Sequence, residues 1–429
     1  MHPRAATAFA RPQEVMGQRA NLAGMGLMRT PRLSLALAAG SLTRAATRVS
    51  GRAGDGVHAR GVAIMKVEPR AIRILAQGRS TVMVTGTNGK TTATHMIARA
   101  LGDEVAHNAT GANMHSGVVA ALAESRAPWA ALEVDELHFP TLVAQVRPRV
   151  VVLLNATRDQ LDRSHEVARV ATGWERALRG SAAMIVANAA DPHVVAATPA
   201  DRAIWCDPGA RWPDDARTCP RCGQLIDWSP ETWACICGFA MPEAHYRLDG
   251  DDLIDLQGER HNLCLALPGR VNRGNAVMAV AAAAAMCVDV DTALARMAPM
   301  SEASGRFGTY DVGGRPARLI LAKNPAGMAE AMDIVGDAPL IIGINARGVD
   351  GRDTSWLYDV DFASLAGRTI GVTGERRDDL ALRLHLAGAT PLVDADPAVL
   401  APRMPLGDLC LVGNYSNFMV WRRGVPWPR

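Results

Sequence analysis

The stretch that decides the fold is Val84-Thr85-Gly86-Thr87-Asn88-Gly89-Lys90-Thr91-Thr92. The apolar run at residues 81–84 predicts a buried strand, and a helical pattern follows at residues 91–101. A strand, a glycine-rich turn and a helix N-terminus in this order form a cradle for anions, because backbone N–H groups converge there and the helix dipole adds positive potential. The stretch therefore predicts a phosphate-binding loop.

The polar residues of this loop have distinct expected roles. Lys90 is expected to contact the terminal phosphates of a nucleotide, and the hydroxyl of Thr91 suits Mg²⁺. The usual pattern, G-x-x-x-x-G-K-[ST], has glycine where this chain has Val84, so the match is partial. The alternative is an ordinary strand–turn–helix unit with a chance Gly-Lys-Thr. The context, the lysine and the tandem hydroxyls of Thr91 and Thr92 favour the nucleotide site.

Composition restricts the class of protein. A chain of 429 residues predicts two to three domains. A net charge of +3 and only 4% aromatic residues argue against a nucleic-acid partner. Four of the eight cysteines cluster at metal-ligand spacing, which indicates a reducing compartment. The longest apolar run, at 276–288, is too short to span a bilayer and predicts a buried helix. We therefore expect a cytoplasmic protein.

Residues 1–60 predict an N-terminal extension. They are rich in arginine and alanine and contain only two acidic residues, Glu14 and Asp55, which is typical of a transit peptide. The alternative is a misplaced start codon, in which case the first residues are not translated. The basic, amphipathic stretch at 33–49 predicts a helix that packs on the domain, and the alternative is a helix on a membrane surface.

Strands and helices alternate after the loop, with strands expected at 129–134, 150–154 and 182–187 and helices at 117–124 and 166–178. Alternation of this kind predicts an α/β fold with a parallel sheet and helices on both faces. Ligands of such sheets bind at the carboxyl ends of the strands. Glu133 closes its strand there and is our candidate second ligand of Mg²⁺, beside Thr91. The alternative is a solvated acidic turn.

Residues 206–245 differ in composition from the rest of the chain, because they are rich in cysteine, tryptophan and proline. Two pairs of closely spaced cysteines, here called knuckles, are each followed by glycine. They predict a tetrahedral Zn²⁺ site with the ligands Cys219, Cys222, Cys235 and Cys237. The second knuckle is one residue shorter than the usual C-x-x-C, and Cys206 is a spare candidate. The alternatives are a redox pair or free buried thiols. A closed four-thiolate site is structural, so we expect a zinc ribbon inserted in the α/β domain.

A second α/β pattern begins near residue 318, with strands expected at 319–322, 340–344, 368–373 and 409–412 and a helix at 326–335. A polar loop at 345–356 follows an apolar strand and contains Asp350 and Asp353. Functional residues concentrate on such loops. The alternative is a plain Asx turn. We expect an ATP-binding domain at 61–305 and a separate α/β domain at 306–429.

The loop resembles that of the Mur ligase superfamily, whose signature is T-G-T-x-G-K-T-T. Further stretches are similar in the same order: Glu133 at its strand end, residues 155–163, and residues 272–275 before an alanine-rich helix, where an asparagine is expected to cap the helix or face the nucleotide. The resemblance implies ATP-dependent amide-bond formation through an acyl phosphate, with Lys90 and Glu133 in the catalytic centre. The nucleotide-binding residues that it implies are Gly86, Thr87, Asn88, Gly89, Lys90, Thr91, Thr92, Asn275 and Arg306.

The whole arrangement resembles the MurT-type subunits of lipid II isoglutaminyl synthase, which combine a Mur-type ATPase domain, a four-cysteine ribbon and a distinct C-terminal domain. The resemblance implies amidation of the D-glutamate α-carboxylate of lipid II at the inner face of the membrane, in peptidoglycan synthesis. It also implies a partner of the GatD type, a glutamine amidotransferase that supplies ammonia. Asp353, or Asp350 as the second candidate, is implied to complete the partner's catalytic site.

Two departures separate the chain from the Mur ligases that add amino acids. Only about 80 residues precede the loop, too few for a nucleotide-sugar domain. No lysine follows Arg163 where those ligases carry a carbamylated one. These two departures argue against an amino acid as the nucleophile, and the resemblance to the MurT-type subunits implies ammonia instead. Two alternatives remain: a stand-alone amino-acid ligase of the Mur or folylpolyglutamate type, and a nucleotide-binding scaffold subunit without ligase activity.

Overall fold

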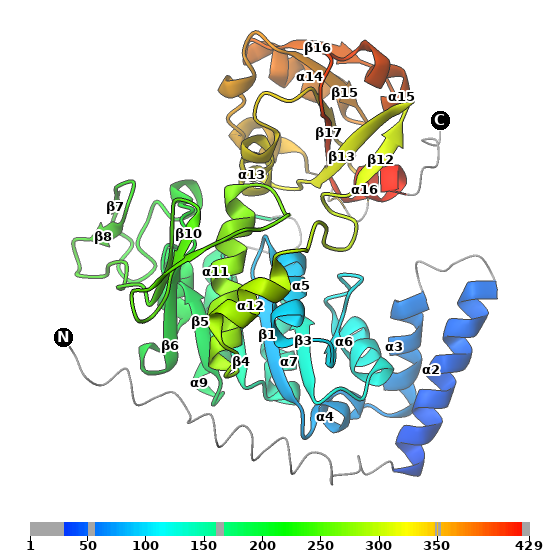
Figure 1. Cartoon of the computed structure of the whole chain (residues 1–429), viewed down its shortest axis with the longest axis vertical. Helices are drawn as coiled ribbons and strands as arrows, with labels where there is room; N and C mark the ends of the chain where they lie inside the picture. Colours follow the sequence, from blue (N-terminus) through cyan, green and yellow to red (C-terminus); the bar gives the residue numbers. More distant parts are fainter. Residues whose placement is uncertain (1–29, 50–55, 160–166, 348–349, 351–352, 423–429) are drawn as a thin grey trace. The chain divides into compact units, whose positions relative to one another are not determined.

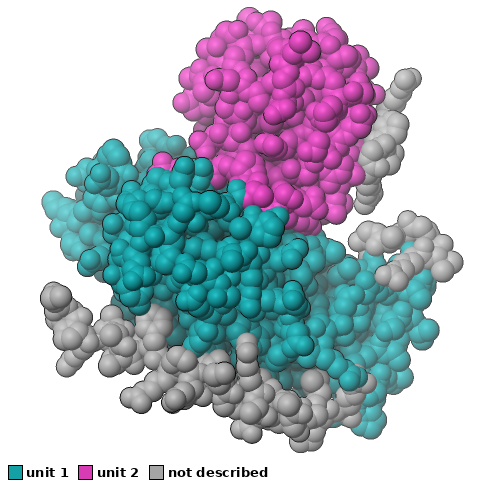
Figure 2. All heavy atoms as spheres, viewed as in Figure 1, with its two compact units in different colours: residues 1–156, 168–265, 271–299 teal, residues 157–167, 266–270, 300–429 magenta. Residues whose placement is uncertain are grey.

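A computed structural model describes residues 30–49, 56–159, 167–347, 350 and 353–422 of the chain. The chain forms two compact units (Figures 1 and 2). Unit 1 contains Met1–Ala156, Ala168–Leu265 and Val271–Pro299, and unit 2 contains Thr157–Val167, Ala266–Arg270 and Met300–Arg429.

A nine-stranded sheet forms the centre of unit 1, in the order β11-β10-β9-β6-β5-β4-β1-β3-β2. The strands from β6 to β2 in this order are parallel, and β9, β10 and β11 form an antiparallel extension. Their bounds are β1 Ser80–Thr85, β2 Val105–His107, β3 Trp129–Glu133, β4 Val150–Leu153, β5 Met184–Asn188, β6 Ala203–Asp207, β9 Tyr246–Asp249, β10 Asp252–Ile254 and β11 Arg260–Asn262.

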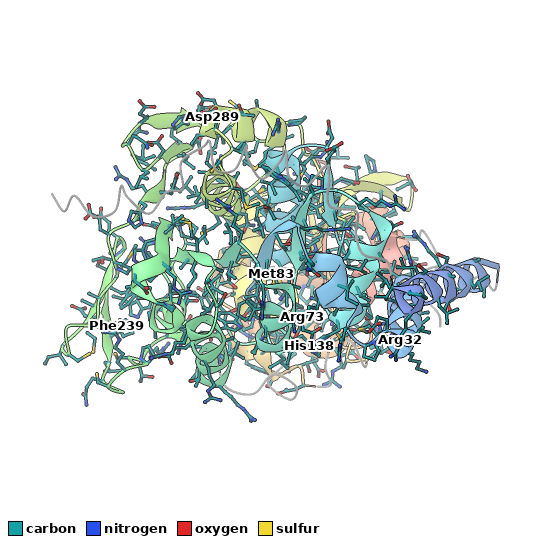
Figure 3. The ribbon with its side chains drawn as sticks, turned by 90° about the horizontal axis from the view of Figure 1, so that it is seen from below. Arg32, Arg73, Met83, His138, Phe239 and Asp289 are labelled. Carbon is teal, nitrogen blue, oxygen red and sulfur yellow. The ribbon has the colours of Figure 1, made fainter. Side chains whose placement is uncertain are left out.

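Strand β1 lies between β4 and β3, with Val84 paired to Glu133 on one side and to Val152 on the other. Residues 82–84 are fully buried, because helices cover both faces of a parallel sheet and a strand there is apolar on both sides. Met83 is labelled in this interior in Figure 3. The predicted parallel α/β fold is therefore confirmed in unit 1.

The α-helices of unit 1, within the described residues, are α2 Pro31–Val49, α3 Gly56–Val67, α4 Ala71–Ala76, α5 Lys90–Leu101, α6 His115–Glu124, α7 Phe139–Val146, α9 Val167–Arg179, α10 Pro192–Ala197, α11 Arg270–Ala285 and α12 Val290–Met297. Five of these, α5, α6, α7, α9 and α10, connect its parallel strands, whereas α2, α3 and α4 precede β1 and α11 and α12 follow β11. Figure 1 shows α11 and α12 in front of the sheet. Parallel strands bring the loops after β1, β3 and β4 to one edge of the sheet.

The prediction that residues 272–275 precede the alanine-rich helix is wrong. Helix α11 begins at Arg270, so Asn272 and Asn275 lie in its first turns and neither caps it. Gly269, at φ +90°, is the residue before the helix. The sequence pattern did not reveal that α11 begins this early, because its first turns are polar and the apolar pattern begins only at Ala276.

Helix α2 packs on α3, and α3 packs on α6. Leu33 and Ala36 of α2 are fully buried, and Arg44 forms an ion pair with Glu124 of α6 at 2.5 Å. The basic stretch therefore packs on unit 1. Within the described parts of the chain, none of the helices combines the length and the apolar character needed to cross a bilayer.

Unit 2 contains a six-stranded sheet in the order β12-β13-β17-β14-β15-β16, parallel except for β12. Its strands are β12 Thr309–Val312, β13 Arg315–Leu321, β14 Leu340–Gly343, β15 Thr369–Thr373, β16 Thr390–Val393 and β17 Leu409–Gly413. Its helices are α13 Pro325–Val335, α14 Arg377–Leu386, α15 Pro397–Leu400, α16 Tyr415–Arg422 and the short 3₁₀ helix η5 Ser355–Asp359. Buried aliphatic residues of β14, β15 and β17 form the core.

The contact of α3 with α6 depends on a glycine. A Cβ added at Gly61 would lie 2.0 Å from the carbonyl oxygen of Ser116, which is backbone and cannot rotate away. We expect Gly61→Ala to lower the free energy of unfolding by about 1–3 kcal/mol, measured by denaturant titration. Gly173→Ala is the control, because its Cβ would meet only Pro140, at 3.8 Å, so this helical site should gain up to about 1 kcal/mol. Equal midpoints for the two variants would contradict the packing.

Candidate functional site

Two glycines shape the loop after β1. Gly86 has φ +142°, and a Cβ there would lie 2.8 Å from Cβ of Leu154. Gly89 has φ +80° and precedes α5, and its Cβ would lie 2.7 Å from Oδ1 of Asn275. Any other residue at these positions would be strained and would crowd Leu154 or Asn275, so both positions require glycine. Val84 lies in the buried strand itself, where the loop needs no glycine.

Asn155, at the carboxyl end of β4, holds the loop in place. The N–H of Asn88 donates to Oδ1 of Asn155 at 2.8 Å, and Nδ2 of Asn155 donates to the carbonyl of Asn88 at 3.2 Å. The N–H of Thr87 donates to the carbonyl of Asn155 at 3.0 Å. The sequence placed residues 155–163 at this edge of the sheet but gave Asn155 no role of its own. Residues 160–163 lie outside the described residues.

Lys90 is held inside the loop. Its Nζ donates to the carbonyl oxygens of Gly86 at 2.5 Å and Thr87 at 3.1 Å, and to Oε2 of Glu136 at 3.0 Å. The side chains of Lys90 and Glu136 are only 8% and 13% exposed, so this ion pair is shielded from water. Sequence reasoning did not single out Glu136. The sequence feature that could have identified Glu136 is its position three residues after Glu133, at the end of the same strand.

Thr91 and Glu133 meet at the same edge. Oγ1 of Thr91 donates to Oε2 of Glu133 at 2.9 Å, and Nδ2 of Asn113 donates to Oε1 at 3.3 Å. Asn108 fixes the backbone of Glu133 through its N–H and its carbonyl, both at 2.8 Å. A hydroxyl and a carboxylate side by side are the oxygen ligands that Mg²⁺ takes in proteins, so these residues fit the ion.

The other expected nucleotide ligands are distributed over both units. The side-chain amide of Asn275 lies against Gly89, as the Cβ position at Gly89 shows. Thr92 is buried in the first turn of α5. Arg306 belongs to unit 2, where its N–H donates to the carbonyl of Ala303 at 3.0 Å.

Four cysteines of unit 1 converge on one point. The sulfur atoms of Cys219, Cys222, Cys235 and Cys237 all lie within 4.8 Å of one another. A short hairpin of β7 (Ile226–Trp228) and β8 (Trp233–Cys235) joins the knuckles, and the Trp233 and Phe239 rings pack beside them, 5.0 Å apart (Figure 3 labels Phe239). Four converging thiols fit a tetrahedral Zn²⁺. Cys206 lies in β6, apart from this cluster.

Two aspartates of the unit 2 loop have opposite environments. Asp350 is buried, and its Oδ1 accepts from the N–H of Ser416 in α16 at 2.9 Å; burial raises the pKa of its carboxyl group. Asp353 is exposed, and its Oδ1 accepts from the N–H of Ser355 at 2.8 Å. That hydrogen bond lowers the pKa of Asp353. The Asx turn that was the alternative interpretation of this loop is present at Asp353, on a carboxylate that solvent reaches.

Paired asparagines fasten this loop to the sheet of unit 2. Nδ2 of Asn414 donates to the carbonyl of Asn345 at 2.7 Å, and Nδ2 of Asn345 donates to Oγ of Ser416 at 2.7 Å. On the other side, Lys323 pairs with Asp159, and Arg158 pairs with Asp359 of η5 at 2.9 Å. The start of the loop and Asp350 are therefore tied to Asn414 and Ser416, just after β17 and in α16, and η5 is tied to Arg158.

Comparisons with known proteins match both units of the chain to the same kind of ligase. The family described as Mur ligase middle domain matches residues 84–203, and the family described as MurT ligase C-terminal matches residues 321–397. Two solved structures share the fold: a pseudomurein peptide ligase type C from Methanothermus fervidus (TM-score 0.62, 16% identity, 80% of this chain and 78% of that chain) and MurF from Acinetobacter baumannii (TM-score 0.60, 18%, 85% and 78%).

Curated relatives extend over most of the chain. The "Lipid II isoglutaminyl synthase (glutamine-hydrolyzing) subunit MurT" of Staphylococcus aureus is 30% identical over 379 residues, covering 81% of this chain and 86% of that protein. The subunit of the same name from Streptococcus pneumoniae is 27% identical, covering 79% and 84%. The predicted family, the Mur-ligase-type fold and the assignment as a ligase are confirmed. The chain belongs to the MurT family of the Mur ligase superfamily.

Proposed function

We propose that the chain is the ATP-dependent amidating subunit that converts the α-carboxylate of D-glutamate in the lipid II stem peptide to the amide. The observation that carries this proposal is that Lys90 and the hydrogen-bonded pair Thr91–Glu133 lie at the same edge of the sheet, in a chain whose relatives are named as lipid II isoglutaminyl synthase subunits. A site of this kind can bring the phosphates of ATP to a second substrate.

The chemistry has two steps. A carboxylate oxygen of the substrate attacks the γ-phosphorus of ATP, and the bond from that phosphorus to the bridging oxygen breaks, which gives an acyl phosphate and ADP. Ammonia then attacks the carbonyl carbon, phosphate leaves, and the nitrogen loses a proton to give the amide. Negative charge on the phosphates is offset by Lys90 and by the loop N–H groups. Mg²⁺, held by Thr91 and Glu133, would supply further positive charge.

Glu136 has a role in this scheme that the geometry suggests. A buried ammonium group without a partner is costly, so the ion pair with Glu136 stabilises Lys90 in the loop before nucleotide binds. When phosphate oxygens reach Nζ, they replace the contacts with the loop carbonyls. We propose Glu136 as a positioning residue for Lys90.

A separate glutaminase of the GatD type is proposed to supply ammonia, in keeping with the words "glutamine-hydrolyzing" in the relatives' names. We propose Asp353 as the residue that enters the partner's catalytic site. Its carboxylate is exposed, and the hydrogen bond from the N–H of Ser355 lowers its pKa and fixes its orientation, so it can orient a catalytic histidine. Asp350 is buried against α16 and, on this view, supports the loop from inside.

We further propose a cytoplasmic location with contact at the inner membrane face, where a lipid-linked substrate lies. The four-cysteine ribbon at 206–245 is proposed as a structural zinc element within an ATP-binding domain at 61–305. Residues 1–60 are proposed as an N-terminal extension whose described part, α2 and the start of α3, packs on unit 1, and residues 306–429 are proposed as the domain that meets the partner.

Lys90→Ala should abolish ATP turnover, because the phosphates lose the positive charge that the loop supplies; a loss of at least about 100-fold is expected. The assay is ADP release with lipid II, partner and glutamine. Lys66→Ala, an exposed lysine at the end of α3, is the control and should retain the activity. If Lys90→Ala releases ADP at the rate of the control, the loop after β1 is not the phosphate-binding loop.

Asp353→Asn should reduce glutamine-driven amidation at least about tenfold and leave ammonium-driven amidation unchanged, because only the first reaction needs the partner's active site. Asp361→Asn is a matched control: Asp361 is also exposed, and its Oδ1 accepts from the N–H of Ala363 at 2.8 Å in the same kind of turn. Equal losses in both reactions would place Asp353 in the ligase centre instead.

Native protein should contain one zinc ion per chain in elemental analysis. Cys235→Ser should lose the metal and lower the melting temperature, because a closed thiolate site contributes folding energy. Cys264→Ser, at an exposed cysteine outside the cluster, should retain both. Metal-free native protein with an unchanged melting temperature would favour free thiols.

A further inference from the structure

The charges of the chain are distributed unevenly along the sequence. Residues 30–79, which precede β1, contain nine lysines and arginines and two acidic residues. Residues 80–429 contain 33 lysines and arginines and 40 acidic residues, so this longer part is net negative. The basic segment forms α2, α3 and α4 of unit 1, which take no part in the candidate nucleotide site or the cysteine cluster. A positively charged layer of this kind attracts an anionic partner.

Helix α2 has two opposite apolar faces. One face packs on α3, and Leu33 and Ala36 on this face are fully buried. Leu35 and Leu42 are 63% and 73% exposed, and their spacing of seven residues places them on the opposite face, with the exposed Ala38 between them. Figure 1 shows α2 on the outside of unit 1, with α3 between it and α6. The outer face of α2 therefore presents an apolar stripe to solvent.

Basic side chains gather where α2 begins and α3 ends. Nε of Arg32 donates to the carbonyl oxygen of Val67 at 2.7 Å, which joins these two helix ends. Lys66 precedes Val67, and Arg70 and Arg73 lie at the start of α4. All four basic residues are exposed, and Figure 3 labels Arg32 and Arg73 in the view from below. We call Arg32, Lys66, Arg70 and Arg73 the basic end of this layer.

An apolar stripe next to a basic end is an arrangement that suits the surface of an anionic bilayer. Aliphatic side chains enter the boundary between head groups and acyl chains, and lysine and arginine attract the phosphates of anionic lipids. The stripe begins at Leu35, one helical turn after Arg32, so the two parts are continuous on the surface of unit 1. A nucleic acid would use the positive charge but would leave both leucines in water.

We propose that unit 1 docks on a bilayer that contains anionic lipid, with Leu35 and Leu42 in the head-group region and the basic end on lipid phosphates. Helix α2 then packs on unit 1 through one face and binds lipid through the other. The inference rests on the proposed function, because a lipid-linked substrate lies at a bilayer surface. Docking raises the local concentration of that substrate at the loop that holds Lys90, which belongs to the same unit.

The test measures sedimentation of the full chain with vesicles. Vesicles of phosphatidylglycerol and phosphatidylcholine in equal parts should bind the chain at least about tenfold more tightly than vesicles of phosphatidylcholine alone, and added salt should weaken the binding. The double variants Leu35→Ser/Leu42→Ser and Arg70→Gln/Arg73→Gln should each weaken binding to the anionic vesicles at least about tenfold. Because these side chains are exposed, the melting temperature should stay unchanged. Wild-type binding to neither vesicle, or full binding by both variants, overturns the proposal.

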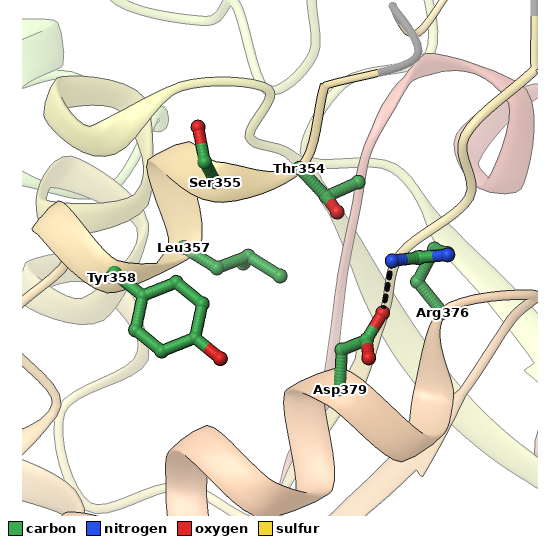
Figure 4. A pocket seen from close by; sticks show the side chains of 6 residues that line it. All are labelled: Thr354, Ser355, Leu357, Tyr358, Arg376 and Asp379. Carbon is green, nitrogen blue, oxygen red and sulfur yellow. Dashed lines mark ion pairs between the residues drawn. The ribbon is translucent and has the colours of Figure 1, made fainter.

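A groove in unit 2 provides the control (Figure 4). It lies between η5 and α14, and Tyr358 in its lining is 62% exposed. Its two charged residues, Arg376 and Asp379, form an ion pair at 2.5 Å, so the groove has an exposed apolar ring without net positive charge. Tyr358→Ser should therefore bind anionic vesicles as tightly as wild type. A loss as large as that of the α2 variants would assign the lipid contact to unit 2 and overturn the proposal.

Amidation separates docking from catalysis. With lipid II in anionic vesicles, ammonium-driven amidation by Leu35→Ser/Leu42→Ser should fall at least about tenfold, whereas a water-soluble, short-chain lipid II analogue should be amidated at the wild-type rate. Equal rates of variant and wild type on vesicles overturn the docking proposal, as does a wild-type dimer that this variant converts to a monomer. If wild type amidates neither substrate but still sediments with anionic vesicles, the proposed function fails and the docking surface stands.

Discussion

The carboxyl ends of β1, β3 and β4 meet at one edge of the sheet, and the candidate nucleotide site of unit 1 depends on this constraint. The loop after β1 supplies Lys90 and Thr91, the end of β3 supplies Glu133 and Glu136, and Asn155 after β4 holds the loop. Without the register that sets Val84 beside Glu133, the threonine hydroxyl and the carboxylate would not meet at 2.9 Å. Buried, β-branched strands make that register rigid.

The charged groups of the candidate sites are buried in unit 1 and exposed in unit 2. In unit 1, Lys90 and Glu136 are shielded from water, so their mutual attraction is strong and the loss of either leaves a costly buried charge. In unit 2, Asp353 is exposed to solvent, and one backbone hydrogen bond lowers its pKa. The first arrangement suits a site that binds dense phosphate charge, and the second suits a carboxylate that is presented to another protein.

Local patterns were sufficient for much of the fold. The strand–loop–helix at residues 81–101, the buried strands and the cysteine spacing follow from periodicity and from ligand chemistry, and each is found within a few residues of its expected bounds. The start of α11 was missed because its first turns are polar, and Glu136 was missed because nothing local distinguishes it from Asp135. Asp350 and Asp353 are equally polar in sequence, and only burial separates them.

The sequence by itself determined the glycine-rich loop after β1, the family and the four cysteines that converge, because each can be recognised from residue types and their spacing along the chain. Only the tertiary structure decided which groups meet across the chain: Glu136 on Lys90, Asn275 on Gly89, and the groove between η5 and α14 beside Asp353. These contacts join residues about 20 to 190 positions apart, and strand register and packing, rather than local propensity, bring such residues together.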